Sequence, residues 1–376
     1  MEKQLNDYKG IIFFGGGVLA GRLCKQIEDI DNKLIAVFDL LDEDRKIKEF
    51  HGLTIQNADD ILTQLSDENN AIVVAIGHFD VFKIVNKLLD SYAFIEGRIF
   101  VVNPYQSLRF FLLDDELSSD IRIPFDDERY TCVREMLSEN YSVKIFNKLV
   151  TSKPYENIND TYEIIPYESI KDMYYYTEDY WETYDFGTSD RSGAATVLDC
   201  GAYIGDSVLP ICNTIPEDEI YYYAIEPLED NVKVIKNNPQ FKTVCRELQI
   251  MEYGVGEKDE NLYFHLPPNG DPEGGRFTKD PENASGKLAI KKIDSLDIDY
   301  KGSVYIKMDI EGLELSALKG AVNTIKKYKP YLAICLYHRK NDLVDIPLFI
   351  DSLGVKYNFY LRGGYHTILW AIPKTV

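Results

Sequence analysis

The sequence is poor in positive charge and in long apolar runs. Lysine and arginine total 41, against 62 aspartate and glutamate residues, and the formal net charge is −21 at pH 7. This charge repels a phosphate backbone, so nucleic acid is not an expected partner. No apolar run approaches the roughly 20 residues of a membrane-spanning helix. Residues 1–7 are polar and do not resemble a secretory signal. We therefore expect a cytoplasmic protein without a membrane span.

The cysteines do not form a recognisable motif. No Cys-x-x-Cys pair occurs, and most of the six lie in apolar runs, at Cys24, Cys132, Cys200, Cys212, Cys245 and Cys335. Buried free thiols have this distribution, so we expect free thiols.

The length of the chain suits more than one domain. Its 376 residues exceed one typical core and fit two domains with a connector. Alternating strand and helix patterns predict an α/β fold with two Rossmann-like, doubly wound sheets joined by a helical connector. We place the N-terminal domain at residues 1–104, the connector at residues 105–190 and the C-terminal domain at residues 191–376.

The N-terminal domain opens with a glycine-rich turn between a strand and a helix. Four strands are predicted at residues 10–14, 34–38, 71–76 and 98–102, and three helices at residues 18–30, 59–65 and 80–89. Gly15, Gly17 and Gly21 lie in and after the turn, and Asp39 follows the second strand, which is close to a dinucleotide fingerprint. A nicotinamide or nucleotide-sugar site and a docking or regulatory module are equal alternatives here.

The connector is expected to contain one long helix. Apolar side chains recur at near-helical spacing, which predicts a helix over residues 128–149. We expect this region to cap the pocket of the C-terminal domain.

The C-terminal domain is organised around residues 196–205. A short apolar run ends in Asp199, and the small residues Gly201, Ala202 and Gly205 precede a helix. Small residues allow a backbone to approach a ligand closely. Glu226 ends the next strand, where a carboxylate can accept the ribose hydroxyls of a nucleoside. The alternative is a βαβ unit whose tight turn binds nothing.

Later strands bring further polar residues to the same edge. We predict strands at residues 249–255, 260–266, 303–308, 331–337, 356–361 and 367–372, and helices at residues 228–237 and 313–326. Ligands bind at the carboxyl ends of parallel strands, where Asp309, Glu311 and His338 join Asp199 and Glu226. A structural role near a helix start is the alternative for His338. Loops at residues 267–287 and 339–347 are expected to shape an acceptor pocket.

Four stretches carry a resemblance to a known family. They are LDCGAYIGDS (198–207), AIEP (224–227), IKMDIEGLELSALKGA (306–321) and KPYLAICLYHRKNDLVDIPLFIDSLG (329–354). About half of the chain resembles the FkbM family of S-adenosylmethionine-dependent methyltransferases. The N-terminal domain resembles the Rossmann-like modules fused ahead of such enzymes in bacterial surface-polysaccharide gene sets.

The resemblance implies a class I methyltransferase fold, in which a final antiparallel strand inserts beside parallel ones. It implies S-adenosylmethionine as the cofactor and O-methylation of a small molecule or glycan, with a role in polysaccharide biosynthesis. The cofactor turn would comprise Asp199, Gly201, Ala202, Tyr203, Gly205 and Asp206. Glu226 would hold the ribose hydroxyls, and Asp309 would lie near the methionine end of the cofactor and the acceptor.

Methyl transfer to a hydroxyl also needs a group that takes up a proton. A base within hydrogen-bond reach assists this step. His338 is the first candidate, with Asp309 orienting it or the acceptor. Glu311 is the second candidate, or else caps the following helix. Asp309 and Glu311 could hold a divalent cation, but no further ligand is evident, and we expect no metal.

Two other functions are compatible with the sequence. The first is an NAD-linked or nucleotide-sugar enzyme that uses the N-terminal domain. The second is a non-catalytic scaffold that binds S-adenosylmethionine or a partner. The oligomeric state is open, with a homodimer as one option.

Overall fold

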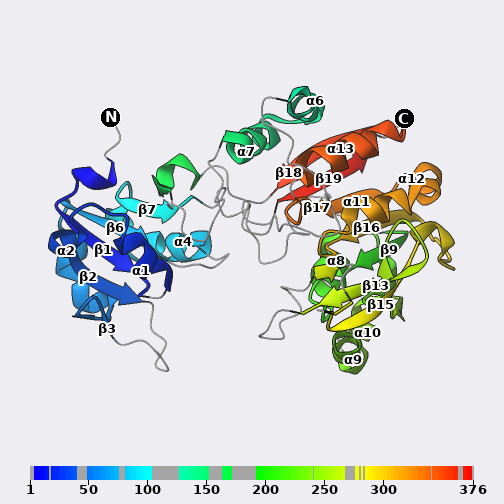
Figure 1. Cartoon of the computed structure of the whole chain (residues 1–376), viewed down its shortest axis with the longest axis horizontal. Coiled ribbons are helices and arrows are strands. Elements are labelled where there is room, and N and C mark those ends of the chain that lie inside the picture. The colour runs from blue at the N-terminus through cyan, green and yellow to red at the C-terminus, as the bar shows by residue number, and fades with distance from the viewer. Residues whose placement is uncertain are drawn as a thin grey trace. The chain divides into compact units, whose positions relative to one another are not determined.

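Two compact units make up the chain, each with its own large sheet (Figure 1). The first unit contains Met1–Phe110 and Ser152–Glu178, and the second contains Phe111–Thr151 and Asp179–Val376. Residues 105–190 contribute to both units, and the domain boundaries given above stay a prediction. The computed structural model describes residues 4–16, 18–39, 49–75, 81–103, 127–151, 163–171, 192–239, 241–266, 276–278, 281–282, 284–339, 341–362 and 367–374.

The first unit alternates strands and helices, as predicted. Its main strands are β1 (Gly10–Phe14), β2 (Leu34–Asp39), β5 (Gln56–Asn57), β6 (Asn70–Val74), β7 (Ile99–Val102) and β8 (Ile164–Pro166). Their order is β5-β2-β1-β6-β7-β8, and β8 is antiparallel to β7 while the other pairs are parallel. The remaining elements are α1 (Val18–Cys24), α2 (Ile30–Lys33), α3 (Leu62–Ser66), α4 (Val81–Ser91) and a hairpin of β3 (Glu49–Phe50) and β4 (Leu53–Thr54).

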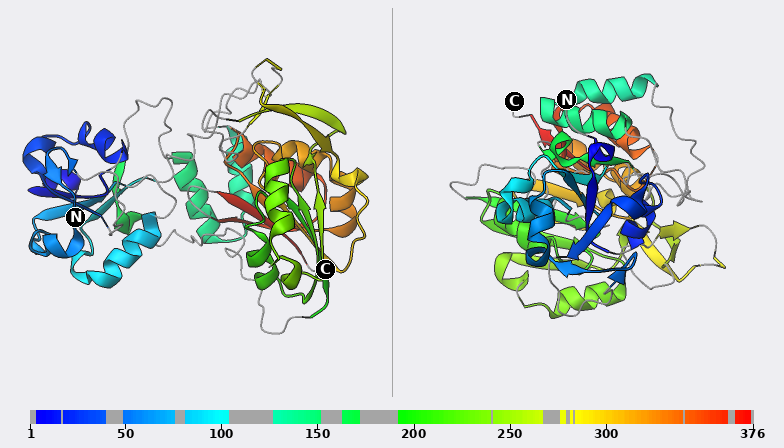
Figure 2. Two further views of the ribbon diagram at one scale, coloured as in Figure 1. Left: turned by 90° about the horizontal axis from the view of Figure 1, so that it is seen from below. Right: turned by 90° about the vertical axis from the view of Figure 1, so that its left-hand side faces the viewer.

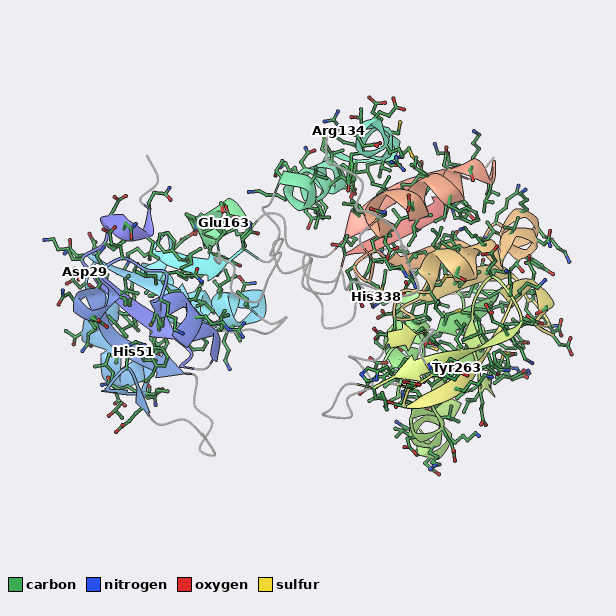
Figure 3. All side chains as sticks on the ribbon, in the orientation of Figure 1. Asp29, His51, Arg134, Glu163, Tyr263 and His338 are labelled. Atoms are coloured by element: carbon green, nitrogen blue, oxygen red, sulfur yellow. The ribbon has the colours of Figure 1, made fainter. Side chains whose placement is uncertain are left out.

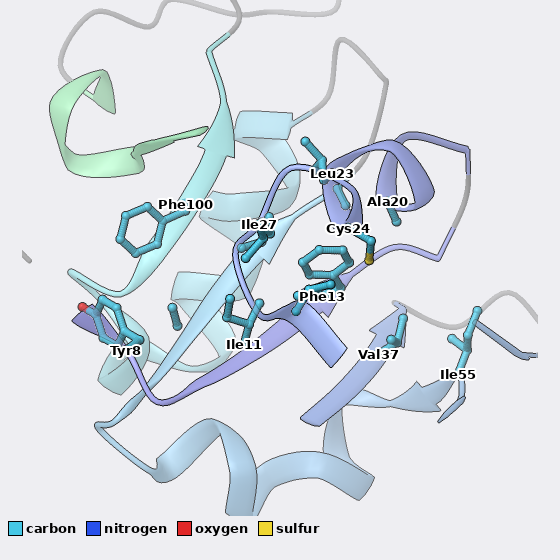
Figure 4. Close-up of a cluster of buried hydrophobic side chains, with 14 residues drawn as sticks. Tyr8, Ile11, Phe13, Ala20, Leu23, Cys24, Ile27, Val37, Ile55 and Phe100 are labelled. Atoms are coloured by element: carbon cyan, nitrogen blue, oxygen red, sulfur yellow. The ribbon is translucent and has the colours of Figure 1, made fainter. Parts of the chain in front are cut away.

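Both faces of this sheet are covered. Successive side chains of a strand point to opposite faces, and every residue of β1 is buried. Ile11 and Phe13 belong to a cluster with side chains of α1 (Figure 4). Phe14 points to the other face, where its ring packs edge-on against Phe38 at 5.0 Å between centroids. A strand buried on both faces explains the continuous apolar run seen in the sequence.

One predicted helix of this unit is shorter than expected. The sequence predicted a helix over residues 18–30, whereas α1 ends at Cys24 and α2 begins at Ile30. Asp29 between them is left-handed, with φ of 57°. A continuous right-handed helix cannot contain that backbone conformation, so the prediction of a single helix was wrong.

The second unit has the strand order of a class I methyltransferase. Its main strands are β9 (Ala194–Cys200), β10 (Glu219–Ile225), β11 (Glu247–Met251), β16 (Ser303–Met308), β17 (Tyr331–Cys335), β18 (Tyr357–Arg362) and β19 (Ile368–Pro373). Their order is β11-β10-β9-β16-β17-β19-β18. Strand β19 is antiparallel to both neighbours, which confirms the inserted antiparallel strand. Its Trp370 is fully buried.

The helices of this unit are α6 (Glu128–Met136), α7 (Asn140–Thr151), α8 (Val208–Thr214), α9 (Glu229–Asn237), α10 (Phe241–Val244), α11 (Glu314–Lys319), α12 (Val322–Tyr328) and α13 (Asp342–Ser352). Helix α7 contacts β18, and α6 contacts α13 (Figures 1 and 2). Short 3-10 turns occur in the two units at η1 (Leu5–Asp7), η2 (Ala58–Ile61), η3 (Ala93–Ile95), η4 (Tyr167–Ser169) and η8 (Ile293–Ser295). Within the described residues, no helix has the length and apolar character needed to cross a bilayer.

Two further predicted helices are interrupted. The helix expected over residues 128–149 breaks between α6 and α7, where the Ser138 N–H donates to the Phe359 carbonyl at 2.8 Å. The break allows this segment to pair with β18. The helix expected over residues 313–326 breaks at Gly320, where a side chain would lie 2.0 Å from the backbone oxygen of Gly256. The close approach of the two backbones requires glycine at this position.

A small sheet was not predicted as a unit. It contains β12 (Gly254–Val255), β13 (Glu260–His265), β14 (Arg276–Thr278) and β15 (Gly286–Lys291), in the order β12-β15-β13-β14. The strand expected over residues 249–255 is therefore divided between two sheets. The expected loop over residues 339–347 is also wrong in part, because α13 begins at Asp342. Residues 267–275 of the other expected loop lie outside the described residues.

We expect the Ser142→Ala variant to be less stable than the wild type by about 1–3 kcal/mol. Ser142 is fully buried, and its Oγ accepts from the Leu361 N–H at 2.9 Å. Its removal leaves that N–H in β18 without this acceptor. Chemical denaturation measures the change, with the exposed Ser352→Ala as the matched control. Equal stability of the two variants would show that the contact between α7 and β18 contributes little.

Candidate functional site

The turn between β9 and α8, residues 201–207, has an unusual backbone. Gly201, Tyr203 and Gly205 have φ values of 78°, 47° and 83°. A side chain at Gly201 would lie 1.9 Å from the backbone oxygen of Asp309. A side chain at Gly205 would lie 2.5 Å from the ring of Phe241. Both positions therefore require glycine, for conformation and for space.

Glu226 follows β10 and holds this turn in place. Its Oε2 accepts from the Tyr203 N–H at 2.9 Å, and its Oε1 accepts from the Leu228 N–H at 2.9 Å and from Asn231 Nδ2 at 3.3 Å. Burial raises the pKa of Glu226 above its usual range, although these donors oppose the rise. A carboxylate offers about four acceptor positions. Among the described contacts, one position on Oε2 is left for a ligand hydroxyl.

A buried ion pair lies beneath the β9–α8 turn. Asp199 Oδ1 accepts from Lys307 Nζ at 2.8 Å, and Asp199 Oδ2 accepts from the Tyr222 hydroxyl at 2.8 Å. Lys307 Nζ also donates to the Gly201 carbonyl at 2.9 Å. The Asp199 and Lys307 side chains are 0% and 2% exposed. The pair therefore ties β9, β10 and β16 to the first residue of the turn.

The pair is best described as charged. Burial lowers the pKa of Lys307, but the charges of Asp199, Asp309 and Asp206 and the hydrogen bond to Asp199 together outweigh it, and the net direction is upward. Burial raises the pKa of Asp199, opposed by Lys307 and Tyr222. Lys307 and Tyr222 both donate to Asp199, and an ionised carboxylate only accepts hydrogen bonds. Both oxygens of Asp199 thus have internal partners, so it supports the turn from below.

The other predicted turn residues differ in exposure. Ala202 is buried and its N–H donates to the Ile225 carbonyl at 3.1 Å, whereas Asp206 is exposed. Ala202 therefore fixes the backbone against β10, and Asp206 faces solvent.

A second group of polar residues surrounds His338, which follows β17 (Figure 3). We call Asp309, Glu311, Glu314 and His338 the His338 cluster. His338 Nδ1 lies 2.8 Å from Glu314 Oε1. On the other side of the ring, Nε2 lies 3.5 Å from Asp309 Oδ1 and 3.7 Å from Glu311 Oε2. Carboxylates therefore face both ring nitrogens.

This arrangement gives His338 a positive charge. Burial lowers the pKa of His338, but the charge and hydrogen bond of Glu314, with the charges of Glu311 and Asp309, raise it to about 10. The imidazole side chain is only 9% exposed. At neutral pH His338 is therefore an imidazolium whose Nδ1 donates to Glu314 Oε1, while its Nε2 lies within ion-pair distance of Asp309 and Glu311. A protonated ring cannot take up another proton, which weakens the prediction that His338 is the base.

Asp309 connects the two groups of residues. Its N–H donates to the Cys200 carbonyl at 3.1 Å, next to the β9–α8 turn. Its Oδ1 accepts from the Tyr337 hydroxyl at 2.8 Å. Glu311, two residues further on, is left-handed with φ of 55°. The predicted convergence of strand-end residues on one sheet edge is thus seen in the geometry, although their roles stay a prediction.

The His338 cluster could also hold a metal ion. One ligand atom from each of Asp309, Glu314 and His338 lies within 4.8 Å of the others. A histidine must give up a proton at the ligating nitrogen before it can bind a metal. The hydrogen-bonded imidazolium therefore competes with a cation for this place.

The predicted nucleotide site of the first unit is described only in part. Gly15 has φ of 93°, and its N–H donates to the Phe38 carbonyl at 2.9 Å. Gly21 lies within α1. Gly17 and the side chain of Asp39 lie outside the described residues. A nucleotide site at this turn stays a prediction.

Sequence reasoning missed three residues of the second unit. Lys307 interrupts a buried apolar strand, and a charge at such a position indicates a buried partner, so this signal was available. Tyr337 and Glu314 offered no comparable signal in the sequence. Glu314 lies in the first turn of a helix, where acidic residues are ordinary.

Comparisons with known proteins agree with this geometry. The strand order places the second unit in the class I methyltransferase fold. Residues 199–357 match the family model of the Methyltransferase FkbM domain. The second unit therefore carries an FkbM methyltransferase domain, and S-adenosylmethionine is the methyl donor that this implies. The Rossmann-like character of the first unit is not identified by this match.

Solved structures similar to the chain are also methyltransferases. Methyltransferase FkbM from Methylobacillus flagellatus KT matches with a TM-score of 0.52 and 22% identity, over 97% of this chain and 90% of that chain. This match supports the fold. Precorrin-6y C5,15-methyltransferase from Geobacter metallireducens GS-15 matches with a TM-score of 0.30 and 14% identity, over 49% and 82%. A SAM dependent methyltransferase from Aquifex aeolicus matches with a TM-score of 0.29 and 15% identity, over 50% and 84%. No curated protein matches the sequence.

We expect the Lys307→Met variant to lose about 3–5 kcal/mol of stability, because it leaves the Asp199 carboxylate buried without its cation. Chemical denaturation measures the change. Lys301→Met is the matched control, since Lys301 pairs with Asp299 at the surface and is 42% exposed. That control is expected to lose little stability, because an ion pair at the surface is screened by solvent. Similar losses in both variants would contradict a dominant role for the buried pair.

Proposed function

We propose that the protein is an S-adenosylmethionine-dependent O-methyltransferase that acts on a hydroxyl of a sugar, in a surface glycan or its precursor. One observation carries the proposal. The buried carboxylate of Glu226 fixes the β9–α8 turn through Tyr203 and keeps an acceptor position on Oε2. That position suits a ribose hydroxyl of the cofactor, and it lies next to the β9–α8 turn, which falls within the residues matched by the FkbM domain model.

The proposed cofactor site extends from Glu226 to Asp309. The backbone of Gly201, Tyr203 and Gly205 forms the surface for the cofactor, because glycine allows close approach. Asp199 acts through Lys307 by holding the Gly201 carbonyl. Asp309 lies against Gly201, which suits a place near the methionine end of the cofactor and the acceptor. S-adenosylmethionine would supply the methyl group as a sulfonium.

The chain's own residues would orient the acceptor and take up its proton. Displacement at a methyl carbon needs the acceptor oxygen in line with the sulfur, so alignment is the main requirement. We propose that one of the two part-exposed carboxylates, Asp309 or Glu311, accepts the hydroxyl proton. Their side chains are 23% and 32% exposed. His338 would hold both carboxylates through its Nε2–H rather than act as the base.

The two alternative functions predicted from the sequence make different binding predictions, which can be tested. A nucleotide enzyme based on the first unit would bind a nicotinamide or nucleotide sugar through Gly15. A scaffold would bind the cofactor without any methylated product. Location in the cytoplasm and a part in polysaccharide biosynthesis belong to the main proposal.

We expect S-adenosylhomocysteine to bind the wild type and to bind the Glu226→Gln variant at least about tenfold more weakly. Glutamine keeps the size of the side chain but presents one acceptor oxygen in place of two. Titration calorimetry measures both affinities. Glu229→Gln is the control, because Glu229 begins α9 and pairs at the surface with Lys233 at 3.0 Å. Absence of binding to the folded wild type would remove the proposed function.

We expect turnover to stay level from about pH 7 to 9 and to fall as the pH rises through about 10, the pKa of His338. The imidazolium is the form that holds Asp309 and Glu311, and it is lost above that pKa. A pH profile of kcat, with a sugar acceptor found by screening, measures this. The His338→Gln variant should be slower and should lack the fall near pH 10. Turnover that instead rises with pH towards 10 would indicate that neutral His338 is the base.

A further inference from the structure

Two cysteines that are far apart in the sequence meet in the second unit. Cys212 lies in α8, and Cys245 follows α10. Their sulfur atoms are 3.2 Å apart, although the two residues are 33 positions apart in the sequence. Neither cysteine is in a disulfide bond. A further approach of about 1 Å would bring the sulfur atoms to the ~2.0 Å of a disulfide bond.

The two thiols differ in accessibility. Cys212 is 2% exposed, whereas Cys245 is partly exposed. A small oxidant from solvent therefore reaches Cys245 first. Cys212 then lies beside it as the second thiol, which is the arrangement of redox-active cysteine pairs.

We propose that Cys212 and Cys245 form a reversible oxidation site, with a hydroperoxide as the oxidant. The Cys245 thiolate attacks the terminal peroxide oxygen and the O–O bond breaks, which gives a sulfenic acid. The other oxygen leaves and takes up a proton from solvent, so that it becomes an alcohol, or water when the oxidant is hydrogen peroxide. The Cys212 thiolate attacks the sulfenic sulfur, the S–O bond breaks, and the oxygen leaves as water. For hydrogen peroxide, two thiols and one peroxide give one disulfide and two water molecules. A dithiol such as dithiothreitol reverses the reaction by two successive thiol–disulfide exchanges.

The pair is placed where a crosslink would act on the β9–α8 turn. Helix α8 follows this turn directly, and α10, which precedes Cys245, contacts α8. Phe241 of α10 packs against Gly205 of the turn. A bond between Cys212 and Cys245 would therefore join the two segments that meet at this contact. The site itself does not depend on the proposed methyltransferase activity.

The test uses the full chain, treated with hydrogen peroxide, alkylated with N-ethylmaleimide and analysed by peptide mass spectrometry. We expect peptides of Cys212 and Cys245 joined with the loss of two hydrogen atoms, and their separation by dithiothreitol. We also expect the unfolding temperature to rise by several degrees on oxidation, because the closed loop lowers the entropy of the unfolded chain.

Two variants make the result decisive. Cys245→Ser should lose the linked peptides and the shift in unfolding temperature, while its unfolding temperature under reducing conditions matches that of the wild type. Cys132→Ser, which removes an exposed thiol, should keep both effects. Alkylation of Cys212 and Cys245, with N-ethylmaleimide added after the oxidised chain is denatured, at peroxide doses that oxidise Cys132 would overturn the proposal. Linked peptides between other cysteines would also overturn it.

Discussion

The buried pair of Asp199 and Lys307 is the interaction on which the second unit depends. It joins β9 to β16 at the centre of the sheet, and both side chains are buried. A single buried charge in that place would destabilise the fold. Here Lys307 and the Tyr222 hydroxyl both donate to the Asp199 carboxylate, and the two opposite charges compensate each other. Because Lys307 also donates to the Gly201 carbonyl, the same charge that stabilises the sheet shapes the turn above it.

The site is therefore built in two layers. The lower layer, Asp199 and Lys307, is closed to solvent and sets the position of the backbone. The upper layer contains Glu226 at one side and the His338 cluster at the other, and it keeps groups that can meet a ligand. The Asp309 N–H bond to Cys200 links the layers. A substitution of Asp199 or Lys307 would therefore change the position of the site's backbone, although neither side chain would contact a ligand.

Most of the fold could be predicted from the sequence, and the side-chain partners could not. Strand ends such as Asp309 follow from apolar runs, and parallel pairing brings them to one edge. The contacts at the helix breaks were missed because the partners lie far away in the chain: Gly320 meets Gly256, and Ser138 meets Phe359. The charge of His338 was missed for the same reason, since Glu314 reaches it only in the folded chain, from 24 positions away in the sequence.

The charge of the His338 cluster also bears on the order of events under the proposed function. Three carboxylates surround one imidazolium, so the cluster keeps a negative charge that attracts a sulfonium. Transfer of the methyl group converts the sulfonium into a neutral thioether, and this attraction is then lost. The same residues would favour the cofactor before the reaction and release its product afterwards. A fully neutral site would lack this electrostatic difference between the two forms.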